Sequence, residues 1–279
     1  MYGSAPPRPG ATMAAEFSWR DDEGVDQPLT PGATLLSAFP SAGLATIIAA
    51  HYMVRALKLP RTGRFDSPDL APVAVVQGGE VHPTIRVYGR PDVGLVVSEF
   101  PPTPSQATGI ARAILDNAER RQARAVICLE GVVPHPEGDD DASSSVPDDA
   151  PEQVWVTFSR KDPAFRAPFE AARARLLEEG VIGGVSGAML VQGIGRRVPV
   201  AALLVSSRVA DGLPDHRAGA ALIEALDRLM PELKIDTGPL RAQAEQIEKA
   251  LRAVMKSHPT GGEAPTGPAE QPPSPEMYR

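Results

Sequence analysis

Apolar residues along the chain gather into short runs that alternate with segments of helical spacing. The runs at 33–39, 125–129, 154–158 and 198–206 are almost continuously apolar, which is typical of strands covered on both faces. Residues 73–77, 80–88 and 94–100 are three further strand candidates. Gly78-Gly79 predicts a hairpin turn between the first two of these.

Apolar residues at helical spacing lie between and after these runs. The pattern predicts helices over 44–57, 105–122, 163–179, 188–195, 215–229 and 239–256. Because strands alternate with helices, we expect a single α/β domain, a three-layer α/β/α sandwich with a mixed sheet.

Three segments lack this periodicity. Residues 1–32 are rich in Pro, Gly and Asp, residues 134–152 are rich in acids, and residues 257–279 hold six of the 30 prolines. Such segments bury too little apolar surface to repay the entropy of ordering. We therefore expect a flexible N-terminal arm at 1–32, a core domain at 33–256 with a disordered acidic insert at 134–152, and a disordered tail at 257–279. Met1 and Met13 are alternative starts.

The net charge of −7 is numerically that of the acidic insert. Residues 137–152 carry seven acids and no Lys or Arg, so the remaining 28 of the 35 acids balance the 28 basic residues. A chain without a basic excess argues against a nucleic-acid-binding protein. No run of about 18 apolar residues is present, so no membrane span is predicted. A single cysteine, Cys128, is typical of a reduced, cytoplasmic protein.

Two features invite a catalytic interpretation. The glycine-rich segment 183–187 precedes a predicted helix, where backbone N–H groups can bind phosphate, but a tight packing turn is favoured because its spacing fits no known phosphate loop. Glu99 and Glu130 end predicted strands at neighbouring places, where two carboxylates could perform acid–base chemistry. Partly solvated edge residues or an oligomer contact are the favoured alternative.

The other reactive side chains favour structural roles. His51 lies on an apolar helical face, and His216 lies at a helix start, where a solvated cap is expected. Cys128 lies within an apolar strand, where a thiol is buried and inert. A triad of Ser186, His216 and Asp211 has no support in the spacing. We therefore expect no catalytic residue, no metal and no cofactor.

The chain ends in Met277-Tyr278-Arg279 after a Pro-rich stretch. Such a stretch forms an extended tether. An apolar side chain, a phenol and a free carboxylate form a compact anchor that suits a receptor pocket. We predict these three residues as the partner-binding site.

Several motifs resemble those of the proteasome assembly chaperone 2 family. They are 39–45 (FPSAGLA), 63–72 (GRFDSPDLAP), 183–187 (GGVSG), Pro214-Asp215, and 236–240 (DTGPL) with Ile247-Glu248. They occur in the family's order, and the resemblance covers residues 33–256. The chain departs from the family pattern at Ser41, where a second glycine is common, and near Thr46.

The resemblance implies a fold similar to that of purine nucleoside phosphorylases, without their catalytic residues, and therefore no enzyme. It also implies a homo-oligomer, with a tetramer favoured over a pentamer, that binds the α-ring of the proteasome core particle. Met277, Tyr278 and Arg279 match the family's terminal motif of a hydrophobic residue, Tyr and any residue. They would enter pockets between α-subunits, where the carboxylate of Arg279 would pair with a lysine and Tyr278 would act at the gate.

The predicted function is thus that of an ATP-independent proteasome-binding chaperone or activator. Two alternatives stay open at this point. One is a nucleoside-phosphorylase-like enzyme that uses 183–187 for phosphate, with Glu99 or Glu130 nearby. The other is an oligomeric scaffold that binds another assembly factor through its folded face.

Overall fold

The computed structural model describes residues 16–24, 29–133, 151–208 and 214–246. Residues up to Ala244 form one compact unit, and residues 245–279 belong to a second unit, of which only 245 and 246 are described. The sequence-predicted site Met277, Tyr278 and Arg279 lies outside the described residues, as does most of the acidic insert.

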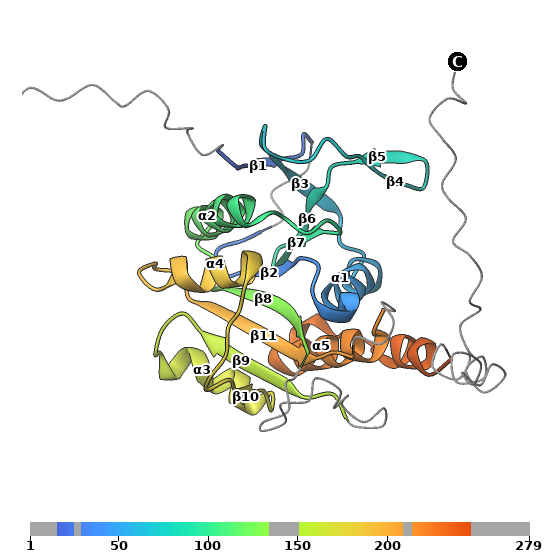
Figure 1. The fold of residues 1–279 in the computed structure, drawn as a ribbon, viewed down its shortest axis with the longest axis vertical. Helices are drawn as coiled ribbons and strands as arrows, with labels where there is room; N and C mark the ends of the chain where they lie inside the picture. The colour runs from blue at the N-terminus through green and yellow to red at the C-terminus, as the bar shows by residue number, and fades with distance from the viewer. Residues whose placement is uncertain (1–15, 25–28, 134–150, 209–213, 247–279) are drawn as a thin grey trace, which may run out of the picture. The chain divides into compact units, whose positions relative to one another are not determined.

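A mixed sheet of nine strands runs through the compact unit (Figure 1). Its strand order is β1 (Ser18–Asp21), β3 (Arg61–Asp66), β6 (Ile85–Arg90), β7 (Val93–Ser98), β2 (Thr34–Ala38), β8 (Ala125–Val132), β11 (Val200–Ser206), β9 (Val154–Phe158) and β10 (Arg175–Leu176). The four central strands β7, β2, β8 and β11 are parallel. β6, β3 and β1 extend one side in antiparallel fashion, and β9 pairs antiparallel with β11 on the other. A small hairpin of β4 (Val75–Gln77) and β5 (Glu80–His82) stands apart from this sheet.

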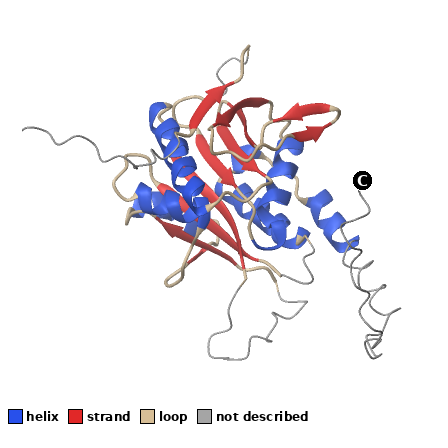
Figure 2. Ribbon diagram, turned by 45° about the horizontal axis from the view of Figure 1, so that its top comes forward, coloured by secondary structure: helices blue, strands red, loops and turns tan. Residues whose placement is uncertain are grey.

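Helices cover both faces of the sheet (Figures 1 and 2). α1 (Ala45–Ala56), α3 (Pro163–Ala171) and α5 (His216–Leu229) pack on one face, and α2 (Pro104–Arg120) and α4 (Gly184–Gly193) pack on the other. Short 3-10 helices, η1 (Ala42–Leu44) and η2 (Pro231–Leu233), precede α1 and follow α5. The prediction of an α/β protein built on a mixed sheet is confirmed.

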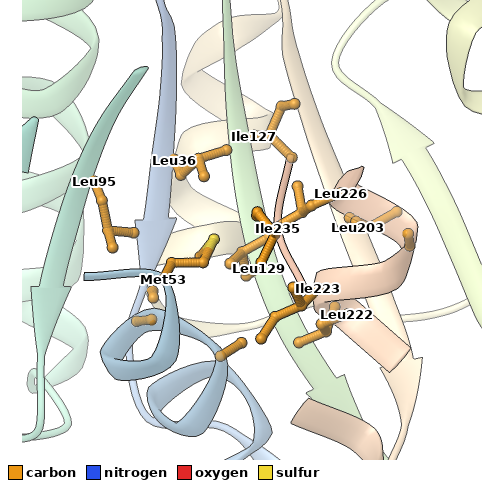
Figure 3. Close-up of a cluster of buried hydrophobic side chains, with 14 of the residues drawn as sticks. Leu36, Met53, Leu95, Ile127, Leu129, Leu203, Leu222, Ile223, Leu226 and Ile235 are labelled. Carbon is orange, nitrogen blue, oxygen red and sulfur yellow. The ribbon is translucent and has the colours of Figure 1, made fainter. Parts of the chain in front are cut away.

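Side chains of β8 show why the central strands are apolar throughout. Val126 and Cys128 are buried in the core under α2 and α4, while Ile127 and Leu129 are buried in the core under α1 and α5. Figure 3 shows the second of these cores, where Leu129 lies among side chains from α1, α5 and the neighbouring strands. A strand covered on both faces has no position for a polar side chain except at its ends.

Part of the predicted flexible arm is folded. β1 pairs with β3, and Phe17 and Trp19 are buried in the core under α2. Trp19 packs on Phe65 with ring centroids 5.6 Å apart, and Phe17 lies so close to α2 that a Cβ on Gly109 would come within 2.5 Å of its ring. The prediction for 1–32 is therefore wrong for residues 16–24, because a few aromatic side chains bury enough surface to order this short strand.

Helix α3 is shorter than the sequence predicts. It ends at Ala171 rather than near 179, and Arg173 adopts a left-handed backbone conformation with φ of 63°. The chain then forms β10, which supplies backbone partners to the outer edge of β9. Satisfying those edge groups competes with continuing the helix.

Two further boundaries differ from the predictions. The strand predicted over 80–88 is divided into β5 and β6, because Pro83 lies between them and cannot donate to a ladder. The helix predicted over 188–195 starts earlier, at Gly184. The last predicted helix is helical over 238–246, and its continuation lies outside the described residues.

Among the helices of the described ranges, none has the length and apolar character needed to cross a bilayer.

Candidate functional site

The carboxyl ends of the four parallel strands meet at one edge of the sheet, which is where open α/β sheets place ligands. The strand ends bring polar side chains to this edge. Glu99 follows β7, Ser41 follows β2, Glu130 lies near the end of β8, and Ser207 follows β11. This edge is therefore the first place to test for a functional site.

The loop after β2 packs closely across the ends of the neighbouring strands. The backbone N–H of Gly131 donates to Ser41 Oγ at 2.9 Å, and the N–H of Asp215 donates to the carbonyl of Gly43 at 2.7 Å. Gly43 has φ of 59°, and a Cβ added to it would lie 2.1 Å from Ser207 Oγ. The first family-like motif thus fills the space above β8 and β11 with its own backbone.

Glu99 forms a charged cluster on the α1 side of the sheet. Its carboxylate pairs with the guanidinium of Arg86, which is fully buried, and lies 2.8 Å from His51 Nε2. Burial alone would raise the pKa of Glu99, but the hydrogen bond with His51 and the charge of Arg86 outweigh this and lower the pKa to about 2. A carboxylate held ionised in this way is a poor proton acceptor. The expectation that His51 is a satisfied structural histidine is confirmed.

Glu130 lies in a different setting. Burial raises its pKa to about 7, and a hydrogen bond with Ser186 of α4 acts in the opposite direction. Burial also raises the pKa of the neighbouring Cys128 thiol, and the charge of Glu130 adds to this effect. The thiol therefore stays protonated, which confirms that Cys128 is an inert buried thiol.

The two carboxylates do not form a catalytic pair. β2 lies between β7 and β8, so the strand ends that carry Glu99 and Glu130 are not neighbours. Glu99 contacts His51 of α1, whereas Glu130 contacts Ser186 of α4, so the two side chains lie on opposite faces of the sheet. The sequence could not show this, because the strand order and the facing of strand ends depend on the tertiary fold.

The remaining sequence candidates also have structural roles. Residues 183–187 form the start of α4, where a Cβ on Gly187 would lie 2.1 Å from the carbonyl oxygen of Ile182. This confirms tight packing at Gly187, whereas nothing lies within 4 Å of a Cβ added to Gly183 or Gly184. His216 starts α5, whose N-cap Asp215 accepts from the N–H of Ala218 at 2.9 Å. Ser186 and His216 lie on helices of opposite faces, and Asp211 is outside the described residues.

Exposed apolar side chains mark the same edge. Leu44, Phe100 and Val133 are 42%, 40% and 56% exposed, and they follow the ends of β2, β7 and β8. Leu44 also has φ of 51°, an uncommon backbone conformation for a bulky residue. We refer to these three residues as the edge trio. Sequence reasoning missed it, because exposure of an apolar residue is not visible in a pattern.

Within the described ranges, His, Cys, Asp and Glu side chains form no group of three or more that could hold a metal ion. The polar groups at the edge are instead engaged in buried pairs and in packing the loops. This arrangement suits a stable scaffold with contact surfaces better than a site for bond-making chemistry.

The sequence and the fold of this chain are similar to those of known proteins. The model of the PAC2 family matches residues 35–255. An uncharacterized protein of Methanocaldococcus jannaschii is 24% identical over 226 residues, which is 80% of this chain and 86% of the relative.

Solved structures share the fold. Pyrococcus furiosus PbaA, described as an archaeal homolog of proteasome-assembly chaperone, has a TM-score of 0.71 at 24% identity and covers 86% of this chain and 92% of its own. PbaB of the same organism, described as an archaeal proteasome activator, has a TM-score of 0.68 at 20% identity over 86% of this chain and 98% of its own. A proteasome-assembly chaperone homologue of Mycobacterium tuberculosis has a TM-score of 0.61 at 16% identity, with 81% and 96% covered.

Proposed function

Because the chain belongs to the PAC2 family, we propose that it is a proteasome-binding chaperone or activator that works without ATP and without catalysis. The observation that carries the proposal is the family match over residues 35–255. The fold shared with PbaA and PbaB, over 86% of this chain in each case, supports the same role.

The contact with the proteasome is made, in this proposal, by Met277, Tyr278 and Arg279. An apolar side chain, a phenol and a terminal carboxylate can fill a cleft, donate a hydrogen bond and pair with a cation. The docking partners are pockets between α-subunits of the core particle, where the carboxylate of Arg279 meets a lysine and Tyr278 acts at the gate. Several tails on one homo-oligomer, a tetramer in our proposal, would act together.

The test compares the full chain with residues 1–276 in binding to core particles of the same organism, without ATP. We expect truncation to remove most of the binding and to abolish any rise in peptide hydrolysis through the gate. A full-length variant with Ser274→Ala is the matched control, because it changes the tether and keeps the terminal triplet. Unchanged binding of residues 1–276 would refute the tail mechanism.

The same experiment distinguishes the tail mechanism from the scaffold alternative, in which the folded domain makes the contact. If residues 1–276 still bind core particles, the folded domain carries the contact. The edge trio is then the surface to examine, since Leu44, Phe100 and Val133 expose apolar area at one edge. Substitution of Phe100 by Ser would weaken binding in that case and leave it unchanged if the tail carries the contact.

The nucleoside-phosphorylase-like alternative gains no support from the geometry. Glu99 and Glu130 lie on opposite faces, and Gly187 packs against the backbone of Ile182 at the start of α4. A phosphate-dependent turnover of any nucleoside by the purified protein would nevertheless require this conclusion to be revised.

A further inference from the structure

A cavity of about 920 Å³ opens at the amino edge of the sheet, the edge opposite the one described above. Its walls come from the starts of β2 and β8, the residues before β11, α3, and the end of α5. Cavities of a few hundred to about 1,000 Å³ hold small molecules in proteins. The cavity shares no lining residue with the carboxyl edge of the sheet or with the edge trio.

The floor of this cavity is apolar. Phe165 and Phe169 of α3, Ile127 of β8 and Met230 line it, and all except Phe165 are buried. Phe165, Phe169 and Phe158 contact one another edge to face, with ring centroids 5.2–5.6 Å apart. Aromatic rings locked against each other present a fixed surface that suits a flat apolar body.

Three arginines stand around this floor: Arg124, Arg160 and Arg197. Arg124 Nη2 donates to Thr34 Oγ1 at 3.0 Å, and Arg160 Nη1 donates to the carbonyl of Arg197 at 3.0 Å. Each of the two guanidinium groups also lies near a carboxylate, Arg124 Nη2 at 3.8 Å from Glu232 Oε1 and Arg160 Nη2 at 3.4 Å from Asp162 Oδ2. These contacts orient the two groups, and each keeps further N–H donors. The Arg197 side chain has no hydrogen bond or ion pair within the described residues and is exposed.

The acids that line the same cavity also have partners, and one of them is a cavity arginine: Asp162 Oδ2 lies 3.4 Å from Arg160 Nη2. Asp162 caps α3 and accepts from the N–H groups of Ala164 and Phe165 at 3.1 and 3.2 Å. Glu119 accepts from the N–H of Arg197 at 2.9 Å and pairs with Arg196 at 3.3 Å. Their carboxylates therefore stabilise the cavity wall, while the guanidinium groups keep donors for an incoming anion.

We propose that this cavity binds a small amphipathic anion, with an aromatic body on the phenylalanine floor and one carboxylate or sulfonate among the arginines. The phenylalanine floor would contact the apolar body of the ligand, and the arginines would pair with its negative charge. Planar guanidinium groups bind carboxylates in a bidentate manner, which sets the orientation of the body. The inference is independent of binding to the proteasome.

The test uses 2-naphthoate as probe and 2-naphthylmethanol as its uncharged counterpart, with isothermal titration calorimetry of the full chain. We expect saturable binding of 2-naphthoate at one site per chain and weaker binding of the alcohol. Arg197→Gln should weaken 2-naphthoate about tenfold, the effect of losing one hydrogen bond to a charged group, and leave the alcohol unchanged. Ala164→Trp, which places a large ring at the exposed start of α3, should block both probes.

Arg112→Gln is the matched control, because Arg112 is exposed on α2 and lies outside the cavity lining. Thermal unfolding of each variant verifies that it is folded. The proposal is overturned if 2-naphthoate shows no saturation up to about 1 mM, a free energy of about −4 kcal/mol. Equal affinities for the two probes, or binding that is insensitive to both Arg197→Gln and Ala164→Trp, would overturn it as well.

Discussion

Two charged side chains in the interior of the described domain are paired with a counter-charge. Arg86 has no exposed side-chain surface and pairs with Glu99. The side chain of Glu152 is only 8% exposed and pairs with Arg217 at 2.7 Å. Glu152 was counted in the predicted disordered insert, yet it belongs to the folded domain, so six of the seven acids of that segment lie outside the described residues. Removal of one partner from a buried pair leaves an uncompensated charge, which makes these residues sensitive to substitution.

Arg86→Met should lower the free energy of unfolding by about 3 kcal/mol, because it leaves the Glu99 carboxylate half-buried without its main counter-charge. Chemical unfolding at pH 7 measures the loss. Arg90→Met is the matched control, since Arg90 pairs with Asp92 at 2.8 Å at an exposed turn. Exposed pairs contribute at most about 1 kcal/mol. Similar losses for both variants would contradict the role of burial.

Glu130→Gln should stabilise the protein at high pH. Burial raises the folded-state pKa of Glu130 to about 7, so the folded protein holds a proton that the unfolded chain has released between about pH 4.5 and 7. Stability therefore falls as pH rises through this range. The glutamine variant avoids the cost, which amounts to about 3 kcal/mol above pH 7 and vanishes near pH 4. Unfolding curves at pH 4, 6 and 8 measure the difference.

Glu99→Gln should have the opposite effect on stability, because here the ionised form stabilises the fold. The pKa of Glu99 is lowered to about 2, so its ionised form stabilises the fold at all pH values above its unfolded pKa near 4.5. The variant should be less stable than the parent at pH 7, and the difference should shrink as pH falls from about 4.5 towards 2. A difference that does not depend on pH would contradict the pairing with His51 and Arg86.

At the scale of elements, the sequence predicted those parts of the fold that are covered on both faces. β2, β8 and β11 were recognised because their continuous apolar runs are buried on both faces. β9 was recognised from a similar run, although only Val156 of this strand is buried. β1 and β3 were missed, because charged side chains join them at the sheet edge. Arg61 pairs with Asp22 at 2.7 Å and Arg20 pairs with Asp66 at 2.7 Å. The apolar residues of these strands are too few for a pattern to detect, namely Phe17 and Trp19 at β1 and Phe65 in β3.

The loop between β2 and α1 should tolerate no side chain at Gly43. Its φ of 59° disfavours other residues, and an added Cβ would lie 2.1 Å from Ser207 Oγ and 2.8 Å from Asp215 Cβ. Gly43→Ala should therefore destabilise the domain by about 3 kcal/mol or more, from a backbone cost of about 1 kcal/mol and the overlap. Chemical unfolding measures the loss.

Gly78→Ala is the matched control for that substitution. Gly78 has the same φ of 59° in the β4–β5 turn, but nothing lies within 4 Å of an added Cβ. Only the backbone cost of about 1 kcal/mol should appear. If the two variants lose equal stability, the loop after β2 is not packed as described.

At the scale of the whole molecule, the domain and the proposed contact differ in what the sequence could reveal. The strand order and the closed carboxyl edge could not be predicted, because they depend on which strands become neighbours. The terminal triplet of Met277, Tyr278 and Arg279 stays a prediction from the sequence, because it lies outside the described residues. The triplet is also short, so one copy is expected to bind weakly. Tight binding must then come from several tails of one homo-oligomer.

A peptide of residues 257–279 should therefore compete with the full-length protein for core particles only weakly. If several tails of one homo-oligomer bind together, the second and later tails bind at a high effective concentration, and the whole protein should exceed the peptide by about 10²–10⁴-fold in affinity. Competition binding with labelled full-length protein measures this ratio, and a peptide of residues 257–276 controls for the tether. Equal affinity of the peptide and the protein would mean that each tail acts alone. The domain would then serve only as a carrier, and the oligomer would have no part in binding.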